Sequence, residues 1–302
     1  MKRILFILLL ICISCKEKKE DTPKDPVNVE IISTEDYELH KVKNSTKLLI
    51  VFPGGGTTSQ ETKADFKILD KATSQGISVL LMNFGRLYLD ETTTTALSSV
   101  LEKAVEDHQL PTDHIIMGGM SIGGSTSLML ANHLHKSESK IAPDKTFIID
   151  SPIDLYALYE SSNKDVQRTD FSERRLAEPK FLVDLFENNF KGETTVLDNI
   201  QKVSPVTLKT DNFENINYLK NGSLRFYTEP DTLWLKETRQ VDFESSNSYT
   251  IQKTATLLNK SGWENVELIQ TKNKGFLSDG TRNPHSWSIV DVDEFLKWIE
   301  KK

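Results

Sequence analysis

One serine in this sequence is framed by glycines in a way that suits a chemical role. The segment Gly118–Gly124 reads Gly-Gly-Met-Ser-Ile-Gly-Gly, with Ser121 at its centre and a glycine two residues away on either side. An apolar run, residues 114–117, precedes it, and a helix-like run rich in Leu, Ala and Met follows. A serine at such a strand-to-helix turn forms a nucleophile elbow, which holds the hydroxyl out beyond the end of a sheet. Any side chain at Gly119 or Gly123 would then collide with the neighbouring helix or strand.

A serine hydroxyl is a poor nucleophile near neutral pH, so it needs a base within hydrogen-bond reach. Of the six histidines, His285 alone follows the last strand-like run, in a loop just before a C-terminal amphipathic run. We therefore expect His285 to be the base. An acid would orient the imidazole and stabilise its protonated form. Asp231 is preferred because it sits in a turn after the strand-like residues 224–227, and Glu229 and Asp150 are the alternatives.

Two places in the chain are expected to supply backbone N–H groups to a developing oxyanion. The first is Ile122, directly after the serine, at the start of the expected helix. The second is the glycine run at residues 54–56, which follows an apolar strand-like run. Glycine lets the backbone approach a ligand closely, so Gly55 or Gly56 is the expected donor.

The elements expected to position these residues alternate between strand and helix, which favours βαβ units and a mostly parallel sheet. Short apolar runs predict buried strands at residues 48–52, 79–82, 114–117, 146–149, 224–227 and 266–269. Helices are expected over residues 62–75, 97–108, 122–135, 249–258 and 286–301, and an antiparallel edge strand over residues 34–42. The long interval at residues 155–217 predicts a small helical cap, with a helix near residues 179–189.

Glycine loop, serine, acid and histidine follow one another in this order, each after a strand or in a loop beyond one. The chain therefore resembles the α/β-hydrolase superfamily, whose order is Ser…Asp/Glu…His, over residues 35–302. Pro53 stands where the HGGG loop of that family has histidine. The resemblance implies the α/β-hydrolase fold, a mostly parallel central sheet flanked by helices with a small cap insertion. It also implies a serine hydrolase with a Ser-His-Asp triad and an acyl-enzyme intermediate.

Carboxylic esters, small or carried on a polymer, are the expected substrates, and two other classes of function stay open. The doubled glycine after Ser121 is also common in family members that act on peptides or transfer acyl groups. A non-catalytic ligand-binding lipoprotein is the rival, but it would have no need to keep serine, histidine, acid and glycine loop together. The sequence lacks metal-ligand spacing, a Rossmann glycine fingerprint and a P-loop lysine, so we expect neither metal nor cofactor.

The N-terminus resembles a bacterial lipoprotein signal. A basic start is followed by the apolar run Ile4–Ile13, which is too short to span a bilayer, and then by Ser14 and Cys15. Cys12 departs from the usual leucine of such signals. The expected divisions are a signal peptide over residues 1–14, lipidated Cys15 with a flexible tether to residue 33, and a hydrolase domain over residues 34–302. This implies a lipid-anchored protein of the bacterial cell envelope, at the outer membrane.

Composition narrows the possible partners. Charged residues make up 27% and apolar residues 37% of the chain, a mixture typical of a globular protein with a real core. The formal net charge is −7, and no basic cluster occurs in the body of the chain. Nucleic acid is therefore not an expected partner, since neutralising phosphates requires a concentrated basic face.

Overall fold

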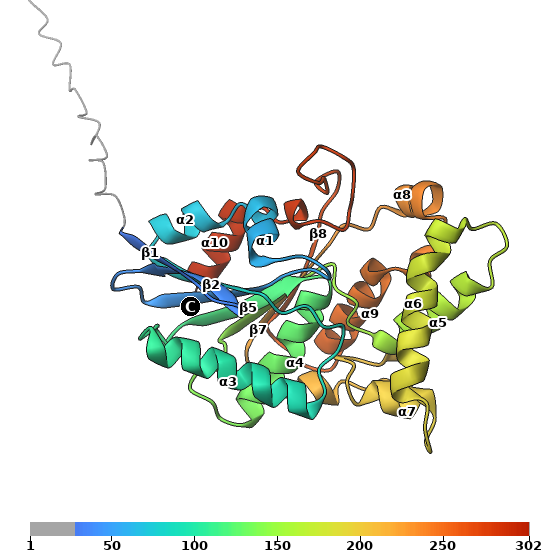
Figure 1. Cartoon of the computed structure of the whole chain (residues 1–302), viewed down its shortest axis with the longest axis horizontal. Helices are drawn as coiled ribbons and strands as arrows, with labels where there is room; N and C mark the ends of the chain where they lie inside the picture. Colours follow the sequence, from blue (N-terminus) through green and yellow to red (C-terminus); the bar gives the residue numbers. More distant parts are fainter. Residues whose placement is uncertain (1–27, 302) are drawn as a thin grey trace, which may run out of the picture.

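The computed structural model describes residues 28–301, in which eight strands form a single sheet with helices on both faces (Figure 1). The strand order is β1-β2-β4-β3-β5-β6-β7-β8. The pairs β1·β2 and β2·β4 are antiparallel, and every other pair is parallel. The strands are Val29–Ser33 (β1), Tyr37–Val42 (β2), Lys47–Phe52 (β3), Ile77–Met82 (β4), Ile115–Met120 (β5), Lys145–Ile149 (β6), Ser223–Thr228 (β7) and Val266–Gln270 (β8). The mostly parallel sheet predicted from the apolar runs is confirmed.

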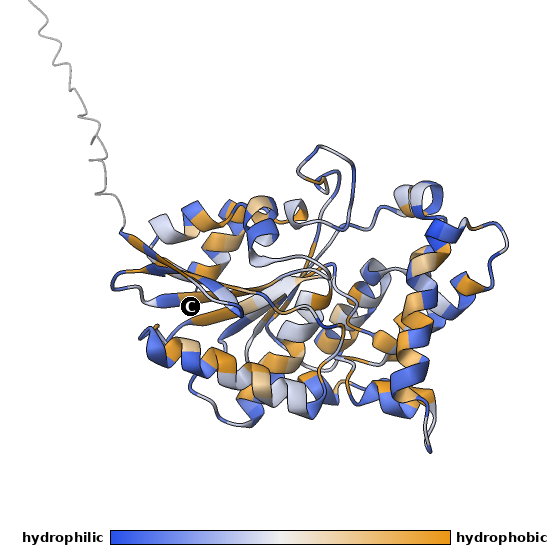
Figure 2. Ribbon diagram, in the orientation of Figure 1, coloured by the Kyte–Doolittle hydropathy of each residue, from blue (hydrophilic) through white to orange (hydrophobic). Residues whose placement is uncertain are grey.

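The central strands are continuous apolar runs because both of their faces are covered. Alternate residues of β3 enter two different cores: Leu48 and Ile50 belong to one, and Leu49 and Val51 to the other. Helices α1 (Ser59–Phe66), α2 (Leu69–Ser74) and α10 (Val292–Glu300) pack on one face, and α3 (Glu91–Asp107), α4 (Ile122–Lys136) and α9 (Asn247–Lys260) on the other. Figure 2 shows the alternation of apolar and polar residues that this packing requires of each helix.

Two expected helices have different bounds in the structure. The helix expected over residues 62–75 is divided into α1 and α2 at Lys67, whose φ of 54° is left-handed and ends α1. The helix expected over residues 286–301 begins only at Val292. A 3₁₀ turn, Trp287–Ile289, precedes it, and the Asp291 side chain caps α10 by accepting from two N–H groups of its first turn.

The N-terminal part of the sheet differs from the expectation in two respects. The strand expected at the edge over residues 34–42 is β2, which lies between β1 and β4. The edge is formed by Val29–Ser33, so the folded part begins before residue 34 and includes the end of the expected tether. This strand gave little signal because it is short and half-exposed beside a Lys-, Glu- and Pro-rich run. The expected signal peptide and Cys15 lie outside the described residues.

The interval at residues 155–217, here called the insertion, holds three helices beside the carboxyl ends of the strands (Figure 1). They are α5 (Leu155–Val166), α6 (Glu173–Phe190) and α7 (Val196–Gln201). The insertion has a small apolar core of its own, formed by Leu155, Phe186, Phe190, Ile200 and Val203. A second excursion between β7 and α9 was not expected. It contains α8 (Thr232–Trp234) and the short helical turns η3 (Leu235–Arg239) and η4 (Phe243–Ser245).

Candidate active site

Ser121 occupies a sharp turn between β5 and α4. Its backbone has φ 54° and ψ −129°, a conformation that a non-glycine residue adopts only where the surrounding structure enforces it. Glycines make the turn possible, because a Cβ at Gly119 would lie 2.6 Å from the carbonyl oxygen of Phe52. A Cβ at Gly123 would lie 2.6 Å from the same oxygen and would overlap the carbonyl oxygen of Pro53. The backbone segments around Ser121 are therefore packed so closely that only glycine fits at positions 119 and 123, as the sequence predicted.

Ser121, Ile122, Asp150 and His285 line one cavity of about 300 Å³. The cavity lies beyond the carboxyl ends of β5 and β6 and is closed on its far side by the insertion and by the excursion after β7. Sites of open α/β sheets occur at this edge, because successive strand ends and loops converge there. The structure thus gathers, on one wall, residues that are separated by up to 164 positions in the chain.

Asp150 is the carboxylate that meets the histidine. His285 Nδ1 lies 2.8 Å from Asp150 Oδ2. The other carboxylate oxygen accepts a hydrogen bond of 2.9 Å from the hydroxyl of Thr228, which is fully buried. Asn247 donates to the Asp150 carbonyl oxygen at 2.9 Å, and the backbone of Asp150 has a left-handed φ of 43°. Because both oxygens are engaged, the carboxylate is fixed in a position from which it orients the imidazole.

Asp231, the acid preferred from the sequence, is turned toward a different partner. Arg282 Nη2 donates to Asp231 Oδ2 at 2.6 Å, and the backbone N–H of Trp234 donates to Oδ1 at 2.9 Å. Burial acts to raise the pKa of Asp231, but these hydrogen bonds hold it below its usual value. The prediction that Asp231 contacts His285 is wrong, because this side chain caps α8 and binds Arg282, and Asp150 takes the expected place.

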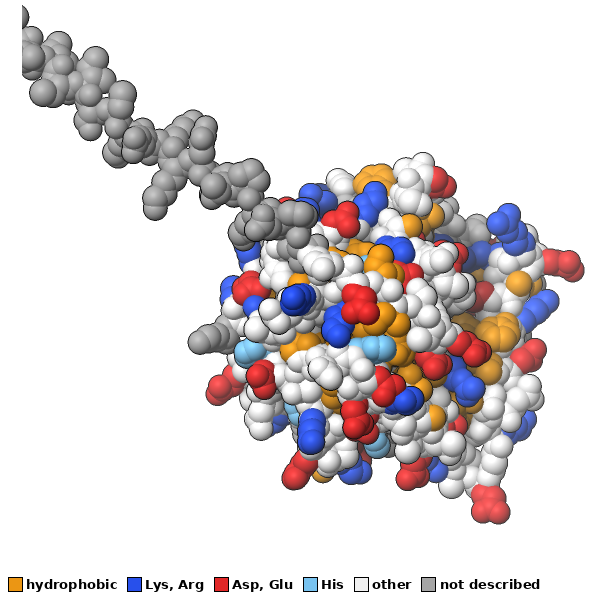
Figure 3. All heavy atoms as spheres, turned by 60° about the vertical axis from the view of Figure 1, so that its left-hand side comes forward, with side chains coloured by type: hydrophobic (Ala, Val, Ile, Leu, Met, Phe, Trp, Pro, Cys, Tyr) orange, Lys and Arg blue, Asp and Glu red, His pale blue; other side chains and the backbone are white. Residues whose placement is uncertain are grey.

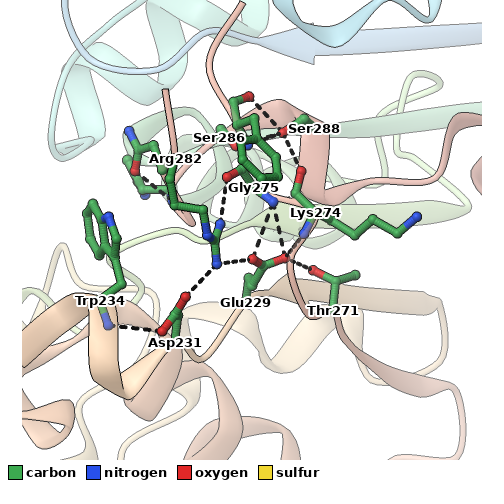
Figure 4. Close-up of polar contacts among 12 residues, drawn as sticks. Glu229, Asp231, Trp234, Thr271, Lys274, Gly275, Arg282, Ser286 and Ser288 are labelled. Carbon is green, nitrogen blue, oxygen red and sulfur yellow. Dashed lines mark hydrogen bonds and ion pairs between the residues drawn. The ribbon is translucent and has the colours of Figure 1, made fainter. Parts of the chain in front are cut away.

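Glu229, the other alternative acid, holds the loop that carries His285 (Figure 4). Its buried carboxylate accepts hydrogen bonds from the Thr271 hydroxyl at 2.8 Å and from the N–H groups of Lys274 at 2.9 Å and Gly275 at 3.2 Å. Arg282 lies 2.5 Å from the same carboxylate and donates to the Gly275 carbonyl oxygen at 2.6 Å.

We call Glu229, Asp231 and Arg282 the loop anchor, because they tie the segment after β8 to the segment after β7 (Figure 4). Sequence reasoning did not find this cluster. Arg282 lies in a loop without a pattern, and its role depends on contacts with residues about fifty positions earlier in the chain.

The glycine loop after β3 lies beside the serine, as its position in the sequence indicated. A Cβ at Gly54 would lie 3.9 Å from the Cβ of Ser121, and a Cβ at Gly55 would lie 3.3 Å from Cδ1 of Ile122. Gly56 has a left-handed φ of 71°, and the Thr57 hydroxyl closes the turn by donating to the Gly54 carbonyl oxygen at 2.8 Å. The loop and the start of α4 thus flank Ser121 together, and the assignment of Gly55, Gly56 and Ile122 as oxyanion donors stays a prediction.

Other residues on the cavity wall had no signal in the sequence. The excursion after β7 contributes Trp234, Leu235, Arg239 and Val241, and the insertion contributes Asp165 and Arg175 among others. The excursion is irregular, and the helices of the insertion carry no recognisable motif. Their positions at the cavity depend on tertiary packing, which a sequence pattern does not reveal.

Comparison with solved structures bears on the fold. An esterase of Pyrococcus furiosus superimposes with a TM-score of 0.53 and 15% identity, covering 90% of this chain and 88% of that chain. Esterase E25 gives 0.54 and 17%, covering 90% and 77%, and carboxyl esterase 2 of the fungus Tuber melanosporum gives 0.52 and 17%, covering 89% and 82%. The chain has the α/β-hydrolase fold. No protein-family model matches this chain, and no curated protein sequence matches it.

The hydrolase fold that the sequence predicted is therefore confirmed, and the structural neighbours named here are esterases. At 15–17% identity these superpositions show the shared fold alone, so the chemistry of the site has to be argued from its own residues. Within residues 28–301, no group of His, Cys, Asp or Glu side chains is arranged to hold a metal ion. Every helix in the same part of the chain is too short or too polar to cross a membrane.

Proposed function

We propose that this protein is a serine hydrolase that cleaves carboxylic esters with Ser121 as nucleophile, His285 as base and Asp150 as the orienting acid. The observation that carries the proposal is the 2.8 Å contact between His285 Nδ1 and Asp150 on the cavity wall that also holds Ser121. With Nδ1–H donated to the carboxylate, Nε2 is free to accept the serine proton. The esterase structures that share the fold support an ester as the substrate.

In the proposed reaction, Ser121 Oγ attacks the ester carbonyl carbon while His285 takes the hydroxyl proton. The negative charge on the carbonyl oxygen is stabilised by the N–H of Ile122 and by an N–H of Gly55 or Gly56. Collapse of this intermediate breaks the carbon–alcohol bond, and His285 returns its proton to the departing alcohol. Water then attacks the acyl-enzyme with His285 as base, which releases the acid and restores the serine.

The decisive experiment for the activity uses p-nitrophenyl esters from acetate to long acyl chains, beside labelling with a fluorophosphonate. We expect turnover and labelling in the unmodified protein, and loss of both in Ser121→Ala. His285→Ala should keep the serine but lose turnover. Labelling without ester turnover would instead favour the peptidase or acyltransferase alternative. Absence of both would overturn the hydrolase proposal in favour of a ligand-binding protein.

We also propose that the protein is exported and anchored to the bacterial envelope by lipid on Cys15, where it meets extracytoplasmic esters. The support is the sequence of residues 1–15, with its basic start, short apolar run and cysteine. Cys15→Ser should move the protein from the membrane fraction, and from the detergent phase of a Triton X-114 partition, to the aqueous phase. Retention of Cys15→Ser in the detergent phase would contradict the lipid anchor.

A further inference from the structure

A basic side chain without an acidic partner lies on the wall of the cavity that holds Ser121. Arg175, in the first turn of α6, lines this cavity from the insertion side. Its Nε is buried and makes no hydrogen bond within residues 28–301. Burial lowers the pKa of its guanidinium, and the nearby charge of Arg239 lowers it further. A buried donor without an acceptor is uncommon in folded proteins, so this side chain calls for an explanation.

The neighbouring arginines, Arg168 and Arg239, each form an ion pair with a carboxylate. Arg168 forms a two-pronged pair with Asp170 at 2.7 Å, and Arg239 lies 3.3 Å from Glu178. Over the described part of the chain, Arg175 forms no ion pair of this kind. Its contacts are a hydrogen bond to the backbone carbonyl oxygen of Arg239 and stacking on the ring of Phe171 at 4.8 Å. The stacking holds the planar guanidinium in place and leaves its charge without a carboxylate.

Asp165, on α5, is the acidic group of the same wall that competes for this charge. It lines the cavity and forms no ion pair within residues 28–301. Burial raises the pKa of its carboxyl group, although the charges of Arg175, Arg168 and Arg239 act to lower it. The wall therefore presents one guanidinium and one carboxylate that face the cavity without touching each other, beside the paired Arg239 and Glu178.

We propose that Arg175 binds a carboxylate on the part of the substrate remote from the scissile bond, so that the preferred esters carry a single negative charge. This inference rests on the proposed function, because it concerns the substrate of the same cavity. Nη2 already donates to the Arg239 carbonyl oxygen and Nε is buried, so Nη1 is the nitrogen of the guanidinium that a carboxylate in the cavity can reach. A charge-assisted hydrogen bond of this kind is stronger in a partly buried cavity than in water. A group with two negative charges fits less well, because Asp165 and Glu178 would repel it.

The test compares esters that differ only in this charge. We would measure kcat/KM for the p-nitrophenyl monoesters of adipic and suberic acid, and divide each by the value for the neutral hexanoate or octanoate of equal chain length. The unmodified protein should favour the charged ester. In Arg175→Gln the ratio should fall by about tenfold, the loss expected for one hydrogen-bonded charge pair.

Two further variants make the result specific to this side chain. Asp165→Asn removes the competing carboxylate, so the ratio should rise rather than fall. Arg174→Gln is the matched control, because Arg174 is the neighbouring residue on α6, is exposed, and does not line the cavity. A ratio that is unchanged in Arg175→Gln, or that falls equally in Arg174→Gln, would overturn the inference. If Arg175→Gln folds poorly, Asp165→Asn still decides the matter, because the ratio of kcat/KM for the charged ester to that for the neutral ester should rise in this variant. A ratio that does not rise would then overturn the inference.

A binding measurement separates this inference from the proposed function. Calorimetry of Ser121→Ala with monomethyl adipate, which is anionic, and dimethyl adipate, which is neutral, does not depend on turnover. Tighter binding of the monoester, lost when Arg175→Gln is added, would support the anion site even if no ester were hydrolysed. Ester turnover with equal binding of the two compounds would retain the proposed function and overturn the anion site.

Discussion

At the scale of single residues, two aspartates compete for one role, since Asp150 and Asp231 both follow strands of the sheet. Their contacts separate them, because Asp150 bonds His285 Nδ1 and Asp231 bonds Arg282. Replacing the orienting acid by its amide leaves the fold intact but favours the wrong imidazole tautomer, which reduces kcat about 10⁴-fold in a well-studied triad. We expect Asp150→Asn to lower kcat by about 10³- to 10⁴-fold.

The matched variant is Asp231→Asn, which changes the acid that sequence reasoning preferred. Its kcat on the same ester should stay within about tenfold of the unmodified protein, because the amide still caps α8 and affects the histidine only through Arg282. The two values come from one set of steady-state measurements. A larger loss in Asp231→Asn than in Asp150→Asn would contradict the arrangement described here.

At the scale of elements, the loop anchor decides where the histidine loop lies. Glu229 is 3% exposed and accepts from one hydroxyl, two backbone N–H groups and Arg282. Glu229→Gln removes the charge opposite a partly buried guanidinium and places two donor hydrogens where N–H groups already point. We expect it to lower the free energy of unfolding by about 3 kcal/mol, as is common when one partner of a buried pair is removed.

Urea denaturation measures the effect of Glu229→Gln, and proteolysis within residues 271–288 reports whether the loop is released. Glu264→Gln provides the control, because Glu264 is exposed just before β8 and forms no ion pair within residues 28–301. If both variants unfolded at the same urea concentration as the unmodified protein, the anchor would not stabilise the loop.

The turn at Ser121 depends on glycine in a way that a single methyl group tests. A Cβ at Gly123 would overlap the Pro53 carbonyl oxygen, so Gly123→Ala must push α4 away from the glycine loop. Overpacking of this kind destabilises by about 1–3 kcal/mol, and we expect ester turnover to be lost with the displaced serine. Gly85→Ala is the control, because a Cβ there would meet no atom within 4 Å. We would measure the thermal unfolding and the ester turnover of both variants. Equal unfolding temperatures and equal turnover in Gly123→Ala and Gly85→Ala would contradict the close packing at Gly123.

Sequence reasoning located the strands and the turn well, because both leave a local signal. Apolar runs bounded by polar residues marked β3 to β8, and the glycine spacing marked the turn at Ser121. Sequence reasoning chose Asp231 instead of Asp150 as the partner of His285, because the choice depends on which strand end lies next to the loop that carries His285. Asp150 has a left-handed φ and a fully buried partner in Thr228, and neither property is visible in a sequence. The excursion after β7 was missed for the same reason, since its short helical turns have no periodicity.

At the scale of the whole molecule, β1 closes one edge of the sheet. Its five residues pair with β2 over their full length, so removing them would leave unpaired the backbone groups of β2 that point away from β4. Exposed strand edges pair with other chains. We expect a protein that begins at residue 34 to self-associate, and one that begins at residue 28 to stay monodisperse at equal concentration. Light scattering on a sizing column measures both, and identical profiles would show that β1 is dispensable.

The surface beside this edge has no dominant charge. Figure 3 shows acidic, basic and apolar side chains interspersed over the face seen there, without a continuous field of one sign. Ion pairs between exposed residues, such as Lys71 with Asp293 and Lys103 with Asp107, contribute little to stability. This face therefore offers no concentrated charge of one sign to attract a highly charged partner.

The edge of the sheet at β1 and the insertion lie at opposite ends of the molecule, which matters for attaching the protein to a support. In Figure 1, β1 lies at the end opposite α5 and α6, which close the cavity. A solid support coupled through Asn28, the residue before β1, would hold the sheet edge and leave the insertion, whose helices line the cavity, at the far end of the molecule from the support. Attachment at this end changes none of the residues that line the cavity, so ligand binding to the unaltered cavity could be measured on the immobilised protein.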